Sequence, residues 1–209
     1  MFAEKIFAIA HYADQVVLFV LLIMSIVSIA MIFERFMSLK KISGESERIR
    51  ARLRMALQTN SIQDFEDIAK DPTSLEGRAA SHALKHLKTH GEKGFEEVFN
   101  TFVLTEKPEL EKYLPVLATI SSNAPFIGLL GTVLGIMKAF NDLAQATDAG
   151  QQTVMAGISI ALVATAAGLF VAIPASMFFN YFTRKVRAIL SSIESVKELG
   201  LAYSKMKGQ

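Results

Sequence analysis

The stretch "NAPFIGLLGTVLGIMKAF", residues 123–140, decides the fold of this chain. Large apolar residues dominate it, as in a segment that crosses a membrane. It also contains a proline, three glycines and a threonine. A helix that only anchors a protein in lipid does not need these residues. Their positions along the helix therefore carry information about packing and function.

Three long runs of the sequence contain no Asp, Glu, Lys, Arg or His, and they cover residues 15–33, 113–137 and 149–183. Each run exceeds the roughly 18 residues that mark a membrane-spanning helix. Lipid offers no hydrogen-bond partner to open backbone groups, so each run is predicted to be helical. The sequence thus predicts an all-α membrane protein with three transmembrane helices.

The first run resembles a secretory signal. However, Lys5 is the only Lys or Arg before it, and no small-residue cleavage site follows it. We therefore expect it to remain as a span. The chain has no cysteine, which excludes disulfides and thiolate metal sites.

Basic residues cluster after the first and third runs, whereas residues 141–152 contain no Lys or Arg. Cytoplasmic loops carry the excess of positive charge, so the amino terminus and residues 141–152 are predicted to be periplasmic. The long connector and the carboxyl terminus are then cytoplasmic. The predicted segments are 1–34 (amino terminus and first span), 35–114 (cytoplasmic helical domain), 115–140 (second span), 141–152 (periplasmic loop), 153–182 (third span) and 183–209 (cytoplasmic C-terminal helix).

Helices are also expected throughout the connector. The first span continues past a weak point at Gly44, and Ser61 is a plausible N-cap for the next helix. A turn at "DPTS" leads into a third helix. Gly91 and Gly94 separate that helix from a fourth one, in which Pro108 and Pro115 are expected to cause kinks or breaks.

Small residues recur at intervals of four along the second and third spans. Residues four apart share a helix face, and small side chains there let two backbones approach closely. One row of each span could pack within the subunit, while the other could face a second copy or a cavity. The predicted packing residues are Ala124, Gly128, Gly131, Gly135, Gly157, Ala161, Gly168 and Pro174.

Thr132 and Thr165 each end a row of small residues inside an apolar span. Their hydroxyls could bond back to a carbonyl one turn earlier, or they could line a wet path. Together with Ser159 they are the candidate lining of a proton path. Proton relays normally need an ionisable group at membrane depth, and these runs have none. A second polypeptide would have to supply the carboxylate.

The sequences "APFIGLLGTVLGIMKAF" and "GISIALVATAAGLFVAIPASMFFNYF" resemble the MotA/TolQ/ExbB proton-channel family, closest to its TolQ and ExbB branch. The resemblance implies a pentamer in the bacterial inner membrane, around helices of an ExbD- or TolR-like partner that carries a proton-binding aspartate. It implies that Thr132 and Thr165 match the threonines facing that aspartate. It also implies that proton motive force drives motion of a TonB- or TolA-like protein.

Ile160 stands where this family commonly carries a glutamate, in a pattern like "GIAEALLATA". The envelope process, the assignment to TolQ, ExbB or a divergent paralogue, and the coupling ion stay open. An oligomeric scaffold that conducts no ions is the alternative function. A substrate transporter is disfavoured, because the three spans show no repeat symmetry.

Other candidate sites in the sequence are weaker. His82, His86 and His90 share one helix face, but no Cys or carboxylate completes a metal set at the usual spacing. A basic cluster after the first run fits anionic lipid better than nucleic acid. No phosphate loop, nucleophile elbow or catalytic triad is present, so we expect neither enzyme activity nor a cofactor.

Overall fold

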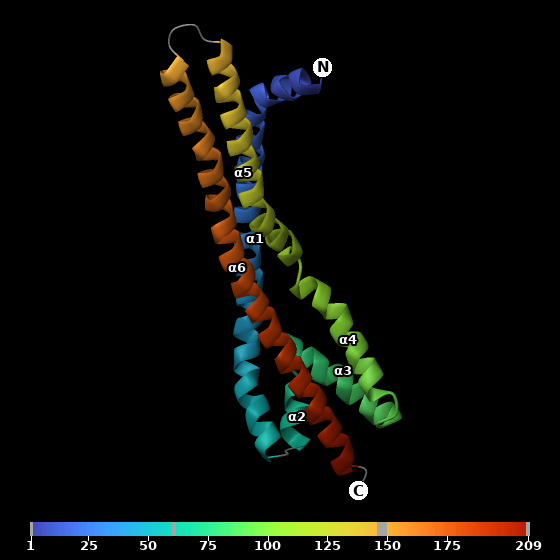
Figure 1. The fold of residues 1–209 in the computed structure, drawn as a ribbon. Coiled ribbons are helices and arrows are strands. Elements are labelled where there is room, and N and C mark those ends of the chain that lie inside the picture. Colours follow the sequence, from blue (N-terminus) through green and yellow to red (C-terminus); the bar gives the residue numbers. More distant parts are fainter. Residues whose placement is uncertain (1, 60–61, 146–149, 208–209) are drawn as a thin grey trace. The chain divides into compact units, whose positions relative to one another are not determined.

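The computed structural model describes residues 2–59, 62–145 and 150–207 (Figure 1). Every secondary-structure element in these ranges is an α-helix, which confirms the all-α prediction. The helices are α1 (Phe2–Thr59), α2 (Ile62–Ala69), α3 (Leu75–His90), α4 (Phe95–Leu110), α5 (Leu114–Gln145) and α6 (Gly150–Lys207). Helices α1, α5 and α6 each contain a segment long and apolar enough to cross a membrane.

The breaks between the helices follow local sequence signals. α1 runs unbroken through Gly44, so this glycine does not end it. The chain leaves α4 only after Pro108 and re-enters helix one residue before Pro115. Between these prolines, Tyr113 has a φ of 63°, in the left-handed region that few non-glycine residues occupy. Ser61 lies outside the described residues.

The chain forms two compact units. The first, here called the span unit, comprises Met1–Phe33 and Tyr113–Asn180. The second, called the connector unit, comprises Glu34–Lys112 and Tyr181–Gln209. Helices α1 and α6 each contribute residues to both units, whereas α2, α3 and α4 belong to the connector unit alone.

The span unit buries many small residues between its helices and leaves large aromatic residues on its outside. α1, α5 and α6 lie side by side, with Ala124, Ala164 and Ala175 among the residues buried between them (Figure 1). Phe126 and Phe170 point outward, with 69% and 77% of their surface exposed. This arrangement suits a lipid surrounding, because lipid solvates large apolar side chains as well as a protein core does.

The connector unit has the opposite arrangement. Phe65, Phe95 and Phe99 are fully enclosed. Near the end of α6, the Tyr203 ring packs against Phe65 with centroids 5.4 Å apart. The turn before α3 is held by local hydrogen bonds. The Ser74 hydroxyl accepts from the backbone N–H of Gly77 at 3.0 Å, as an N-cap. This unit therefore has the hydrophobic core of a water-soluble domain.

Candidate functional site: the threonine pair between α5 and α6

The glycines of α5 and α6 bring the two backbones into direct contact. A Cβ atom added to Gly128 would lie 2.6 Å from the Ala164 carbonyl oxygen. A Cβ atom on Gly168 would lie 2.6 Å from the Ala124 carbonyl oxygen. Neither position can hold a side chain unless the helices separate. We call this contact, formed by Ala124, Gly128, Gly135, Gly157, Ala161 and Gly168, the seam.

Gly131 and Gly135 form a second row of small residues on α5, and this row also packs against other helices of the same chain. A Cβ atom on Gly131 would lie 2.8 Å from the Ala164 side chain of α6 and 2.8 Å from the Val17 side chain of α1. One on Gly135 would lie 2.7 Å from the Ala161 side chain. Both rows of α5 therefore pack against neighbouring helices of the same chain.

The seam brings the two candidate threonines together. The Thr132 and Thr165 hydroxyls form a hydrogen bond with each other across the two helices. The contact depends on Gly128, because a Cβ atom there would lie 3.1 Å from the Thr165 Cα atom. A larger residue at this position would push α6 away and separate the hydroxyls.

Backbone carbonyls surround the hydroxyl pair. The Thr132 hydroxyl lies 3.2 Å from the Ala161 carbonyl oxygen and 3.3 Å from that of Gly128. The Thr165 hydroxyl lies 3.4 Å from the same Gly128 oxygen. Each hydroxyl has one proton to donate, so the pair has more acceptors within reach than protons. Its protons can therefore be redistributed without breaking the helices.

The two hydroxyls differ in accessibility. Thr132 is buried, with 9% of its surface exposed, whereas Thr165 is only partly buried. Thr165 is thus the member of the pair that a group outside the subunit can reach. Thr132 lies behind it, bonded to both helices.

Ser159 and Pro174, two other residues predicted for the site, do not join the pair. Both are exposed on α6. Ile160 is likewise 56% exposed. In the single chain, these residues face away from the seam. Residues 146–149 of the predicted periplasmic loop lie outside the described residues.

The histidines of α3 make contacts of another kind. The rings of His86 and His90 stack with centroids 5.1 Å apart, and His82 packs against Phe102. His86 also contacts the Lys93 carbonyl oxygen at 2.9 Å. The described part of the chain contains no cluster of three or more His, Cys, Asp or Glu side chains suited to a metal.

Arg35 is a buried basic residue that no sequence pattern marked as part of a site. It is 1% exposed and donates a hydrogen bond to the Glu109 carbonyl oxygen at 2.9 Å, near the C-terminus of α4. It also pairs with the adjacent Glu34. A cation at a helix C-terminus stabilises the last carbonyls. Its position directly after an apolar run was the available signal, but the distant partner at Glu109 could not be read from sequence.

A family model described as the MotA/TolQ/ExbB proton channel family matches residues 71–195, more than half of the chain. The chain belongs to this family. The match covers α3, α4 and α5 together with most of α6, and so includes the seam and the threonine pair. It confirms the resemblance drawn from the two span sequences.

Several relatives are similar over part of their length. An ExbB biopolymer transport protein of Aquifex aeolicus is 44% identical over 100 residues, which are 48% of this chain and 67% of that protein. A TolQ protein of the Tol-Pal system of Haemophilus influenzae is 48% identical over 97 residues, 46% of this chain and 42% of that protein. An ExbB protein of Pseudomonas putida is 30% identical over 154 residues, 70% of this chain and 47% of that protein. The chain thus spans about half the length of several of its relatives.

Proposed function

We propose that this protein is the channel-forming subunit of a proton-driven motor in the bacterial inner membrane. In this proposal it forms a homo-oligomer, a pentamer by family resemblance, around an ExbD- or TolR-like partner with a proton-binding aspartate. The motor would convert proton motive force into work on a TonB- or TolA-like envelope protein. The observation that carries the proposal is a pair of bonded threonine hydroxyls in apolar runs (residues 15–33, 113–137 and 149–183) that contain no carboxylate.

The threonine pair can support both protonation states of such an aspartate. An ionised carboxylate in a low-dielectric site is costly unless hydrogen bonds stabilise it. The Thr165 hydroxyl can turn its proton from the Gly128 carbonyl towards the carboxylate, and a hydrogen bond to a charged group contributes roughly 1.5–3 kcal/mol. A protonated carboxyl can instead donate to a hydroxyl oxygen. The Thr132 hydroxyl positions Thr165 through their mutual hydrogen bond, and it can donate its own proton to the Thr165 oxygen.

Substitution by valine tests this role, because valine keeps the shape of threonine and removes the hydroxyl. We expect Thr165→Val to reduce proton-driven function more than Thr132→Val, and the double variant to lose it. The measurement is complementation of a deletion strain, with assembly of the complex checked in parallel. Thr165→Ser, which keeps the hydroxyl, is the matched control and should retain function. Full activity of the double valine variant would remove both residues from the mechanism.

Proton flux separates the motor from an oligomeric scaffold. Vesicles with this protein and its single-span partner should conduct protons, whereas vesicles with either protein alone should not. A scaffold would give no proton flux in any combination.

Native mass measurement of the detergent-purified protein tests the proposed homo-oligomer, and a monomer would contradict it.

The proposed orientation places the amino terminus in the periplasm and the carboxyl terminus in the cytoplasm. Because the chain has no cysteine, single introduced cysteines report without background. Ala146→Cys should react with a membrane-impermeant reagent from the periplasmic side, and Lys205→Cys only after the membrane is opened. The reverse pattern would overturn the orientation.

A further inference from the structure

A groove within the connector unit lies where two apolar runs give way to basic residues. It has a volume of about 350 Å³, and α1 and α6 form its walls. Lys40 and Lys185 contribute one ammonium group from each helix. The lining is Phe36, Leu39, Lys40, Ser43, Gly44, Glu47, Tyr181, Phe182 and Lys185.

The two lysines are held beside aromatic rings. The Lys40 Nζ atom lies 5.9 Å from the Phe36 ring centroid, and the Lys185 Nζ atom lies 5.9 Å from the Tyr181 ring centroid. Both distances are within the range of a cation–π interaction. Phe36 and Tyr181 are themselves partly exposed, at 43% and 45%. Each helix therefore presents an apolar ring with a cation next to it.

The place of the groove along the chain matches the edge of a bilayer. Phe36 and Lys40 follow the end of the first uncharged run at Phe33 by about one and two helical turns. Tyr181 and Lys185 lie on either side of Thr183, the last residue of the third run. Aromatic rings at such positions lie at the level of lipid headgroups, and lysines beside them reach the phosphates.

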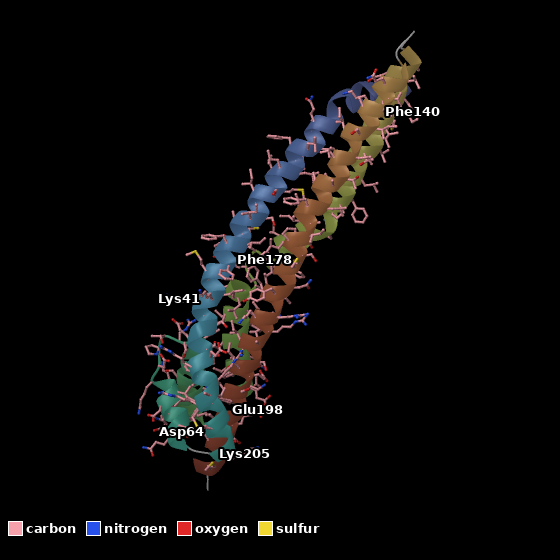
Figure 2. All side chains as sticks on the ribbon, turned by 90° about the vertical axis from the view of Figure 1, so that its left-hand side faces the viewer. Lys41, Asp64, Phe140, Phe178, Glu198 and Lys205 are labelled. Carbon is pink, nitrogen blue, oxygen red and sulfur yellow. The ribbon has the colours of Figure 1, made fainter. Side chains whose placement is uncertain are left out.

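The charge of the surrounding surface is also positive. Within the groove, two lysines outweigh Glu47. A second hollow on α1 shares Lys40 and Gly44 with the groove and adds Lys41 and Arg48 against Glu45 (Lys41 is labelled in Figure 2). Basic pockets between membrane helices bind anionic lipid headgroups.

We propose that this groove binds the headgroup of an anionic glycerophospholipid. The lipid phosphate lies between Lys40 and Lys185, and the first carbons of its acyl chains lie against Phe36 and Tyr181. The Ser43 hydroxyl and the Glu47 carboxylate can accept from a hydroxyl of the headgroup, so phosphatidylglycerol fits the lining. The site is independent of the threonine pair and of the proposed motor.

A tryptophan reporter can test this proposal, because the chain has no tryptophan. Phe36→Trp places one fluorophore in the groove and keeps an aromatic partner for Lys40. The full chain is reconstituted into vesicles, and quenching by brominated phosphatidylglycerol is compared with quenching by brominated phosphatidylcholine. We expect a preference of roughly 25-fold for phosphatidylglycerol, since each of the two lysines near the anionic headgroup contributes about fivefold.

Three variants of this reporter protein separate the groove from general attraction to an anionic surface. Lys40→Gln with Lys185→Gln should abolish the preference. Lys93→Gln with Lys205→Gln removes the same charge from exposed positions outside the groove and should keep it. Gly44→Leu should also abolish it, because Gly44 has open space around it and a leucine there fills the groove while every charge remains.

Several results would overturn the proposal. One is an unmodified reporter without any preference. Another is an equal loss in both lysine pairs, which would indicate only a general surface charge effect. Retention of the preference in Gly44→Leu would show that the groove itself is not the site. Reversal of quenching by inorganic phosphate would assign the site to a soluble anion instead.

Discussion

The span unit and the connector unit solve the same packing problem with opposite residues. In the span unit, glycine and alanine form the contact between α5 and α6, while Phe126 and Phe170 point outward. In the connector unit, Phe65, Phe95 and Phe99 are inside and most charged side chains are outside. Water drives large apolar residues together, whereas lipid does not, so helices in lipid associate by close backbone approach. The span unit should therefore be sensitive to added volume, and the connector unit to lost volume.

The largest effect is expected from adding volume to the seam. In Gly168→Leu, the new Cβ atom alone would lie 2.6 Å from a backbone oxygen that cannot move without its helix. We expect α5 and α6 to separate and the folded protein to be lost, beyond the roughly 1–3 kcal/mol of ordinary overpacking. Denaturation in mixed detergent micelles measures this effect.

Ala166→Leu is the matched control for that change. Ala166 lies on the same helix but is exposed, so the same kind of added volume should be tolerated. Sequence spacing alone did not decide whether Gly131 and Gly168 pack within one chain or between two. Their positions inside one subunit predict that leucine at either site disrupts the subunit before any oligomer. A stable Gly168→Leu subunit would contradict this view of the seam.

The second prediction removes volume from each unit. Phe99→Ala in the connector unit should lower the free energy of unfolding by about 3–5 kcal/mol, because the side chain is 1% exposed and leaves a cavity. Phe126→Ala in the span unit, where the ring is 69% exposed, should have little effect. If thermal unfolding shows an equal loss of stability in the two variants, the distinction between the units would not hold.

A third prediction compares two glycines of the connector unit. A Cβ atom on Gly77 would lie 2.0 Å from the Asp71 carbonyl oxygen, whereas Gly44 has no atom within 4 Å of its Cβ position. Gly77→Ala should therefore destabilise the unit by about 1–3 kcal/mol. Gly44→Ala should stabilise α1 by about 0.5–1 kcal/mol, since alanine loses less backbone entropy in a helix. If the unfolding midpoints of the two variants shift in the same direction, the contact between Gly77 and the Asp71 carbonyl would be contradicted.

The smallest effect concerns pH. Hydrogen bonds from the Thr73 hydroxyl and backbone N–H hold the pKa of the Asp71 carboxyl below its usual value. The stabilisation is therefore present above the unfolded-state pKa and is lost as pH falls through the folded-state pKa. In thermal unfolding between pH 5 and pH 3, Asp71→Asn should lose less stability than the unmodified chain. Parallel acid curves for the two proteins would show that Asp71 contributes nothing.

The sequence predicted the helical architecture because uncharged runs of this length have few alternatives in lipid. Six of the eight predicted packing residues lie in the seam, whereas Gly131 packs against α1 and α6 beside it and Pro174 is exposed. The sequence could not assign the rows of small residues to one subunit or two, since spacing of four serves both contacts equally. Gly44 in α1 shows another limit. A single exposed glycine costs a long helix only about 1 kcal/mol, which the rest of α1 easily offsets.

The threonine pair was predicted in part. Spacing indicated that Thr132 and Thr165 end rows of small residues, but their mutual hydrogen bond depends on the approach of α5 to α6 at Gly128. Ser159 is also a hydroxyl residue of α6, but it lies six residues before Thr165 and faces outward. Spacing is consistent with this difference, because six residues turn an α-helix by about 600° and so place the two side chains on different sides of α6.

The outward position of Ile160 has a consequence for how such proteins can diverge. Ile160 is mostly exposed, whereas its neighbour Ala161 belongs to the seam. The chain can therefore change the chemical group that it presents at position 160 without rebuilding the helix pair that holds the threonines. The packing of this helix pair and the chemical character of its outer surface at this depth are therefore set by separate residues.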